Sequence, residues 1–439
     1  MNATVHNFLS LDLMPLAAGL FAAITCGLLG NFLVLRKLSL MGDAISHSVL
    51  PGLVVAFLIS GLRSPLPMFL GAAIAGIGTV ILVEFVKKVG RVESGAAMGV
   101  VFSILFALGV LLIERASARH IDLDADCVLH GQLETLFWFP PKDWGQVLTW
   151  DTLRQMPRQV VWLFVMAVAA AAFVTLLFKE LRIAAFDADL ATTQGFNAGF
   201  LHYLLMIFVA AATVASFEAV GSILVIAMLI CPAATARMLT DRLRPQIMWS
   251  VALAMVGGVV GYVSASAIPA AFGADSVNAA GMMTVVAGAM FGLAVLASPR
   301  HGVIARIVRL RRLSGSVAME DVLAALFRLG ESEQIAVTMQ ALTAALPGCE
   351  VERGLVLAEG RGLVRRGDRI ILTTTGDAAA RDLVRRHRLW ESYLVTEAGV
   401  AADHVHPTAE RLEHLSVGLE SGILPVVDPH GKRIPPRGR

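Results

Sequence analysis

Charged residues are scarce along this chain. They make up only 16% of its 439 residues, whereas 56% are hydrophobic, and the mean hydropathy is +0.71. Apolar stretches of about 20 residues recur, and each is long enough to cross a hydrocarbon core about 30 Å thick. The composition therefore predicts a membrane protein.

Cysteines are few, and a phosphate-binding loop is missing. The four cysteines, Cys26, Cys127, Cys231 and Cys349, show no disulfide or metal-binding spacing. No G-x-x-x-x-G-K-[ST] motif occurs in the chain, so any ATP hydrolysis must come from another subunit. No basic region precedes the first apolar run, so a cleavable signal peptide is not expected.

Nine apolar segments are predicted to be membrane-spanning helices. They are residues 15–35, 46–62, 66–86, 95–114, 159–179, 198–217, 219–239, 247–267 and 280–298. The boundary at Glu218 is the weakest, because almost no polar loop separates the two spans there. An eight- or ten-span count requires one such segment to be reassigned.

Lysine and arginine are concentrated in alternate loops. These loops carry Arg36, Lys37, Lys87, Lys88, Arg91, Lys179, Arg182, Arg237, Arg242 and Arg244, and more arginines follow the last span. Because cytoplasmic loops are richer in Lys and Arg, we expect the N-terminus outside and the C-terminal region in the cytoplasm, in the inner membrane of a bacterium.

Asp43 and His47 lie at the start of the second span. On a helix, positions four apart share one face. Ionisable groups at membrane depth usually mark a substrate path, and a carboxylate beside an imidazole suits a divalent transition metal. The alternative is an Asp helix cap with a histidine hydrogen-bonded within the protein.

Two further polar features lie on the expected outer side. Glu218 is a candidate path residue, or else a loop-end glutamate that faces water. A loop cluster either guides a cation to the entrance or is simply solvated. Its members are His120, Asp122, Asp124, Asp126 and His130.

The first 300 residues resemble the ABC transporter permeases for manganese, zinc and iron(II). The resemblance rests on residues 42–47 (Gly-Asp-Ala-Ile-Ser-His) with 50–52, on 186–195, on 220–225 and on 231–237. It implies a transporter subunit that is not itself an enzyme. It also implies a second permease copy or paralogue, a cytoplasmic ATPase and an extracytoplasmic metal-binding solute-binding protein.

The segment after the fifth span resembles the motif by which importer permeases couple to their ATPase. The residues are Asp187, Asp189, Ala191 and Gly195. A short helix with small Ala and Gly residues can seat closely in a groove of a partner protein. The alternative is an ordinary solvated loop.

Near residue 300 the composition changes. Residues 300–312 form a basic amphipathic linker suited to an anionic inner leaflet. Helical periodicity follows at 319–330 and 335–346, and a third short helix is expected after 347–348. Two extended runs within 365–375 and a long amphipathic helix at 377–398 complete a pattern that predicts a winged helix.

The tail resembles the iron- and manganese-dependent repressors of the diphtheria-toxin-repressor class, through residues 387–391, 405–406, 409–414 and 428–435. The resemblance implies a manganese-type metal site at Asp321, His387, Glu410, Glu413 and His414. It also implies an ancillary site at His387, Glu391 and His406. Oxygen ligands favour Mn²⁺ or Fe²⁺ over thiolate-preferring metals. One departure is Ala324, where the manganese type offers a glutamate.

DNA binding is not favoured. The expected recognition segment, residues 350–361, contains three acidic residues and two arginines. Binding to DNA phosphates is favoured by basic surfaces. We therefore expect a regulatory domain that has lost, or nearly lost, DNA binding.

Together these observations predict an all-α polytopic membrane protein. About nine transmembrane helices (1–299) precede a basic linker (300–318) and a soluble winged-helix plus helical metal-binding and dimerisation domain (319–439). The expected function is the permease of an ATP-driven importer of divalent metal ions, with Mn²⁺ favoured over Zn²⁺ or Fe²⁺ and no tightly bound cofactor for transport. The tail would hold Mn²⁺ or Fe²⁺ and sense metal. The alternatives are a membrane-anchored metal-responsive transcription regulator and a siderophore or metal-chelate permease.

Overall fold

The computed structural model describes residues 8–60, 65–117, 133–138, 147, 149–332, 337–347, 350–367, 369–412, 414 and 427–435. The chain forms two compact units, Met1–Ala305 and Arg306–Arg439. The loop cluster between residues 120 and 130, two of the cysteines (Cys127 and Cys349) and Glu413 lie outside the described residues.

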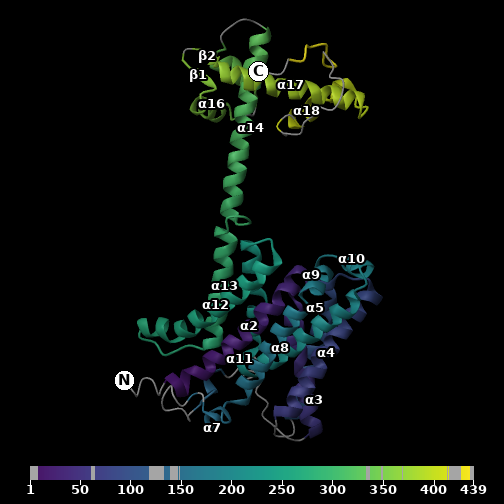
Figure 1. Cartoon of the computed structure of the whole chain (residues 1–439), viewed down its shortest axis with the longest axis vertical. Helices are drawn as coiled ribbons and strands as arrows, with labels where there is room; N and C mark the ends of the chain where they lie inside the picture. The colour runs from purple at the N-terminus through teal and green to yellow at the C-terminus, as the bar shows by residue number, and fades with distance from the viewer. Residues whose placement is uncertain are drawn as a thin grey trace. The chain divides into compact units, whose positions relative to one another are not determined.

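The first unit is a bundle of long helices (Figure 1). They are α2 (Leu13–Leu35), α3 (Met41–Ser60), α4 (Pro65–Gly90), α5 (Ser94–Ser117), α8 (Arg158–Leu176), α11 (Ala198–Leu239), α12 (Leu243–Ala271) and α13 (Ala279–Ala297). Shorter elements are η1 (Phe8–Asp12), η2 (Leu133–Thr135), α7 (Trp150–Leu153), α9 (Phe178–Phe186) and α10 (Ala188–Thr193).

The bundle is apolar on its outside as well as in its core. Ile74, Ile81 and Phe85 of α4 and Ile104 and Leu111 of α5 are all exposed. A soluble protein rarely exposes so much contiguous apolar surface, whereas helices that are apolar all round are typical of a membrane. Within the described residues, nine segments are long and apolar enough to cross a bilayer. The polytopic fold class and the expected number of spans are confirmed.

The long helix α11 contains two of these spans. Gly221 breaks it with φ 78° and ψ 164°, a region that favours glycine. His202 contacts Arg36, just beyond the end of α2, while Leu229 packs on Gly30 of α2. Gly30 and Arg36 are only about 9 Å apart along the helix, but a straight helix would separate His202 from Leu229 by about 40 Å. The chain therefore reverses near Gly221, as the weak boundary in the sequence indicated.

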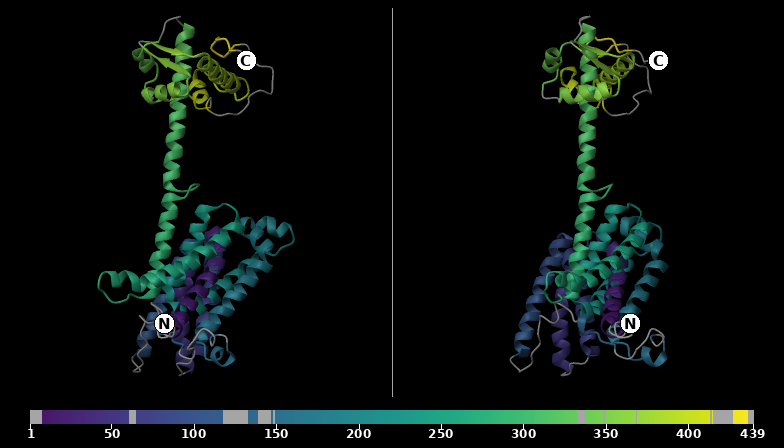
Figure 2. Two further views of the ribbon diagram at one scale, coloured as in Figure 1. Left: turned by 60° about the vertical axis from the view of Figure 1, so that its left-hand side comes forward. Right: turned by 90° about the vertical axis from the view of Figure 1, so that its left-hand side faces the viewer.

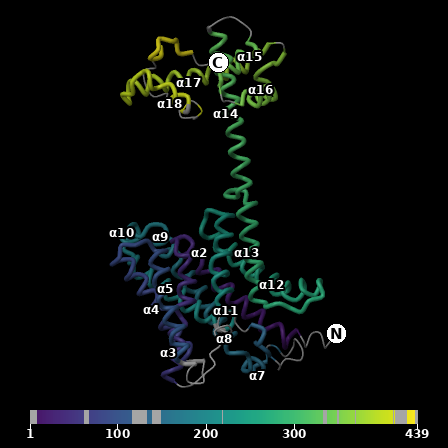
Figure 3. Tube along the Cα trace, turned by 180° about the vertical axis from the view of Figure 1, so that it is seen from behind, coloured from purple at the N-terminus to yellow at the C-terminus, as the bar shows by residue number. Residues whose placement is uncertain are grey.

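Glycines allow α3 to lie close against α4. A β-carbon on Gly52 of α3 would come 2.3 Å from the carbonyl oxygen of Gly71 on α4, and a β-carbon on Gly71 would come 2.4 Å from that of Gly52. Small residues at such contacts let membrane helices approach closely. Figure 3 shows α3, α4 and α5 side by side at one edge of the bundle. The helix that carries Asp43 and His47 is thus packed against α4 through close contact of the two backbones.

The second unit contains a two-stranded sheet among helices (Figure 2). Its elements are α14 (Val303–Ser332), α15 (Met339–Ala345), α16 (Val351–Gly360), β1 (Val364–Arg366), β2 (Ile370–Leu372), α17 (Thr374–Thr396), η4 (Ala402–His404) and α18 (His406–Leu412). The strands are antiparallel, with Val364 opposite Leu372. The order of the elements follows the expectation from the sequence.

Residues 303–318 of the expected basic linker belong to the continuous helix α14. No proline interrupts this stretch, and its one glycine, Gly315, is needed for packing. A β-carbon on Gly315 would come 2.9 Å from the side chain of Leu357 on α16. Farther along α14, Val322 is fully buried in the core of the unit.

Candidate metal sites and the family of the chain

Asp43 and His47 face each other on α3. The helix begins at Met41, so Asp43 lies in its first turn and His47 follows one turn later. His47 Nε2 lies 3.3 Å from Asp43 Oδ1, and the two side chains keep 27% and 35% of their surface exposed, respectively. An oxygen and a nitrogen donor are therefore adjacent and accessible on one helix face.

The surroundings of His47 fix its position. Its ring lies 5.7 Å from the ring of Phe102 and 5.5 Å from that of Phe106, both on α5. Pro51, one turn along α3, has no N–H to donate to the carbonyl of His47. A backbone oxygen is thus released from the helical pattern beside the imidazole.

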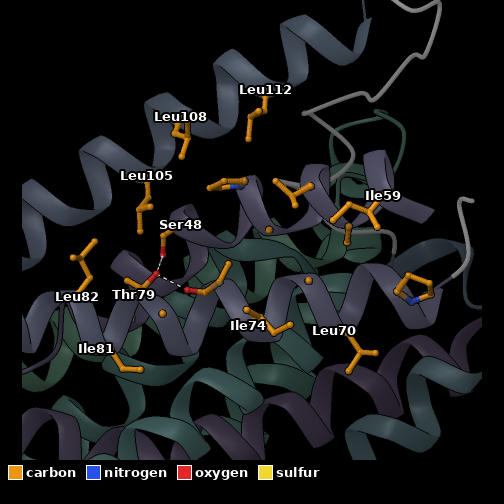
Figure 4. Close-up of a pocket in the computed structure, with 18 of the residues that line it drawn as sticks. Ser48, Ile59, Leu70, Ile74, Thr79, Ile81, Leu82, Leu105, Leu108 and Leu112 are labelled. Carbon is orange, nitrogen blue, oxygen red and sulfur yellow. Dashed lines mark hydrogen bonds between the residues drawn. The ribbon is translucent and has the colours of Figure 1, made fainter. Parts of the chain in front are cut away.

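A large cavity lies between α3, α4 and α5, but its lining carries little chemistry. Its volume is about 870 Å³, and Ile74, Leu105 and Leu108 are among the apolar side chains around it (Figure 4). The hydroxyls of Ser48 and Thr79 are 2.6 Å apart and share a hydrogen bond, and each also lies within hydrogen-bond distance of a carbonyl oxygen of its own helix. Because the described lining residues offer no carboxylate or imidazole, the metal-binding candidates in the membrane unit remain Asp43 and His47.

Glu218 lies on α11 three residues before the break at Gly221. Its side chain is outside the described part of the chain, so its candidate role stays a prediction.

The expected coupling segment forms the short helix α10 beside α9, at the end of the bundle opposite α7 (Figures 1 and 3). Asp187 caps α10, because its Oδ1 accepts hydrogen bonds from the backbone N–H groups of Asp189 and Leu190. Ala191 is fully buried and packs inside the chain. Asp189 is exposed, and Gly195 ends the segment with φ 86°.

The second unit brings together a cluster of two histidines and a glutamate. His387 and Glu391 lie one turn apart on α17, and His406 begins α18. His387 Nε2 is 3.0 Å from both Glu391 Oε1 and His406 Nδ1, and His406 Nδ1 is 2.8 Å from that same carboxylate oxygen. Two imidazoles and a carboxylate with converging donor atoms fit a divalent transition metal.

The protonation state of Glu391 suits such a ligand. Burial opposes ionisation of this carboxyl, but the hydrogen bonds from His387 and His406 outweigh burial and lower the pKa of Glu391 to about 2. The carboxylate is therefore already ionised at neutral pH, as metal binding requires.

His430 also approaches this cluster, and the sequence analysis did not identify it as a ligand. Its Nε2 lies 4.0 Å from Glu391 Oε1. Asp428 accepts hydrogen bonds from the backbone N–H groups of His430 and Lys432 and lies 3.7 Å from Nε of Arg388. The Asp-Pro-His-Gly turn at residues 428–431 is the feature of the sequence that could have drawn attention to His430. Its proximity to Glu391 on α17 is not apparent from the sequence.

A second histidine environment forms around His414. Nε2 of His414 lies 3.3 Å from Asp321 and Nδ1 lies 2.7 Å from Glu320. Glu320 was not among the sequence-predicted residues. Glu410 is exposed, and Glu413 lies outside the described residues. His387 contacts Glu391 and His406, so among the described residues it belongs to the first cluster, and its expected place in the manganese-type site stays a prediction.

Ala324 has a structural explanation. It is buried with Leu383 and Val384 of α17 and contacts Phe327. An acidic side chain at this position would lose these apolar contacts and place a charge in the core. The departure from the manganese-type pattern therefore contributes to packing between α14 and α17.

The profile of the ABC 3 transport family matches residues 11–137 and 143–296. The chain belongs to this family. The profile of the iron dependent repressor, metal binding and dimerisation domain matches residues 373–436, which contain the cluster of His387, Glu391 and His406. Both resemblances noted in the sequence are confirmed.

Several proteins are similar to the membrane unit. The manganese transport system membrane protein MntD of Bacillus subtilis is 36% identical over 301 residues, which are 69% of this chain and 97% of the relative. The zinc transport system membrane protein TroD of Treponema pallidum is 37% identical over 291 residues, covering 66% and 75% of the two chains. The structure of PsaBC from Streptococcus pneumoniae in complex with Fab matches at 28% identity with a TM-score of 0.55, over 71% of this chain and 100% of that one.

We predict that the cluster on α17 and α18 binds Mn²⁺. His387→Ala should lower the affinity of the full-length protein for Mn²⁺ at least tenfold. Even mutation of a residue that only hydrogen-bonds to a metal ligand typically lowers metal affinity by about tenfold or more. Affinity should fall as the pH is lowered, because histidines must be deprotonated to bind metal while Glu391 remains ionised. Isothermal titration at several pH values measures both effects.

The control for this experiment is His404→Ala, which removes an exposed histidine from the neighbouring η4. Equal affinity of wild type, control and His387→Ala would show that the cluster does not bind the metal.

Proposed function

We propose that the chain is the permease subunit of an ATP-driven importer of bare divalent metal ions, with Mn²⁺ favoured over Zn²⁺ or Fe²⁺. The observation that carries this proposal is the accessible pair of Asp43 and His47 on α3. Such a pair binds an ion only moderately, which suits transport because a site that binds too tightly cannot release its ion. The pair also favours bare ions over bulky metal chelates.

The family and the similar proteins support the metal class. One relative belongs to a manganese system and another to a zinc system. Oxygen ligation by Asp43 inclines the pair toward Mn²⁺ over metals that prefer sulfur.

The permease would work in an assembly. It would pair with a second permease, receive the ion from an extracytoplasmic binding protein and dock on a cytoplasmic ATPase through α10 and Gly195. The exposure of Asp189 and the absence of atoms within 4 Å of a β-carbon on Gly195 support docking at this place. The loops at this end of the bundle are rich in Lys and Arg, which favours placing α9 and α10 on the cytoplasmic side of a bacterial inner membrane.

The tail would act as a cytoplasmic metal sensor that adjusts transport. Its cluster of His387, Glu391 and His406 supports metal binding. The alternative, a membrane-anchored transcription regulator, would need free cations on the expected recognition helix α16.

Two of the arginines on and beside α16 instead pair with acidic residues at the start of the same helix. Arg366 of β1 donates to both carboxylate oxygens of Glu352 on α16, at 2.7 and 3.2 Å. Arg353 bonds Glu350 at 2.6 Å and the carbonyl of Arg311 at 2.9 Å. Neutralised arginines offer little to DNA phosphates, which favours the sensor over the transcription regulator.

Loss of Asp43 or His47 should strongly reduce transport. Asp43→Ala or His47→Ala should reduce uptake of radiolabelled Mn²⁺ by about tenfold or more in proteoliposomes that also contain the ATPase and the binding protein, because each change removes a ligand. The control is Ser46→Ala in the same turn of α3. It removes only a hydroxyl that donates to the carbonyl oxygen of Gly42. Uptake at the wild-type rate by both variants would show that Asp43 and His47 are not needed to bind the transported ion.

Gly195 offers a matched pair of variants for coupling. Because its φ of 86° disfavours β-branched side chains, Gly195→Val should disturb the segment and weaken ATPase co-purification and metal-stimulated ATP hydrolysis. Gly195→Asn tolerates the same backbone and should retain more of both. If the valine variant binds and stimulates the ATPase like wild type, the segment is an ordinary loop.

The sensor should change how transport responds to metal on the cytoplasmic side. Glu391→Gln leaves two imidazoles without their shared carboxylate, so transport should lose its dependence on cytoplasmic Mn²⁺ while uptake itself persists. His404→Ala should keep the dependence. Uptake measured at varied internal Mn²⁺ distinguishes these outcomes, and an unchanged response of Glu391→Gln would exclude regulation through this cluster.

A further inference from the structure

A second, polar cavity lies at the end of the bundle where α9 and α10 are found. Its volume is about 540 Å³. The cationic side chains around it come from two places, Arg36 and Lys37 after α2, and Lys87 and Lys88 at the end of α4. These pairs of cations are far apart in the sequence, and the fold brings them to one hollow.

Among the described lining residues, one carboxylate opposes these four cations, and it already has partners. Buried Glu84 lies 3.0 Å from Nε2 of His202 and 3.3 Å from Nζ of Lys87. Nδ1 of His202 lies 2.9 Å from Nη1 of Arg36. The histidine thus joins Glu84 to Arg36, and the lining keeps an excess of positive charge.

Arg36 is held with little access to water. Its Nε and Nη2 atoms are buried and have no hydrogen-bond partner among the described residues, and burial lowers the pKa of its guanidinium. A desolvated cation raises the electrostatic potential of the neighbouring space, because the surrounding dielectric screens it weakly.

Backbone dipoles add to the same potential. Ser94 at the start of α5 and Ala198 and Gly199 at the start of α11 also line the cavity. The first turns of these long helices carry partial positive charge. The hydroxyl of Tyr203 lies 3.4 Å from Nζ of Lys88 and supplies a hydrogen-bonding group at the rim.

We propose that this cavity binds a phosphate group, carried either by an anionic phospholipid or by a soluble phosphate compound. Lysines at the ends of membrane helices and a hollow between those helices suit a lipid headgroup, and the helix N-termini suit phosphate from either source. The ligand would lie beside Ala185 and Ala188, next to the segment proposed to couple to the ATPase. The proposal does not depend on which metal the chain carries.

The test uses the purified full-length protein and two exposed lysines of the cavity. Native mass spectrometry would compare binding of phosphatidylglycerol and phosphatidylethanolamine, and isothermal titration would measure inorganic phosphate. Lys37→Gln/Lys88→Gln leaves the buried contacts of Arg36, His202 and Glu84 in place. Two lost cations should weaken binding of the anionic ligand roughly thirtyfold, about fivefold for each.

The matched control is Arg242→Gln/Arg300→Gln, which removes two exposed cations that do not line the cavity. Lysine-dependent preference for phosphatidylglycerol would identify a lipid headgroup, and lysine-dependent binding of inorganic phosphate without that preference would identify a soluble ligand. If the lysine variant binds both probes as tightly as the control does, the cavity is not a phosphate site.

Discussion

Polar side chains inside an apolar helix bundle must find partners within the protein, because hydrocarbon offers none. Several polar side chains of the membrane unit meet this constraint in pairs. Gln246 donates to Asn31 at 3.1 Å, and the hydroxyls of Ser48 and Thr79 bond each other. Asp43 and His47 are the pair that also keeps access to the surface. The candidate transport site therefore differs from the structural polar pairs in two ways: its side chains are partly exposed, and they are ionisable.

The same ligand chemistry occurs twice in the chain with different geometry. On α3, one carboxylate and one imidazole offer two donors to a passing ion. On α17 and α18, two imidazoles share a buried carboxylate, and a third imidazole, that of His430, lies 4.0 Å from the same oxygen. More converging donors and deeper burial favour retention of an ion over its release. A weak site for passage and a stronger one for sensing would allow transport to respond to the metal already inside.

The two ends of the bundle serve different needs. At the end with α7, the hydroxyl of Tyr262 donates to Asp12 at 2.9 Å, and Glu134 accepts from the backbone N–H of Ala279. These contacts fasten loops to helix ends. At the end with α9 and α10, positive charge accumulates around Arg36 and His202 beside the proposed coupling segment. Contacts of His202 with both Arg36 and Glu84 mean that α11 cannot shift there without disturbing α2 and α4.

Several features were determined by the sequence alone, because they depend on local spacing. Apolar runs define the spans, and a four-residue spacing puts Asp43 near His47 and His387 near Glu391 on their helices. The positive charges of the loops predict the orientation in the membrane, and this stays a prediction. Family motifs identify both the permease and the metal-binding tail.

Tertiary structure decided the contacts between distant segments. His406 reaches Glu391, Glu320 reaches His414, and Arg36 reaches His202 across 166 positions. The length of α14 and the reversal at Gly221 also depend on packing, through Gly315 against Leu357 and Gly30 against Leu229. Periodicity specifies which face of a helix is apolar, but it contains no information on which other helix covers that face. That choice is made by the close fit of side chains and backbones in the folded chain.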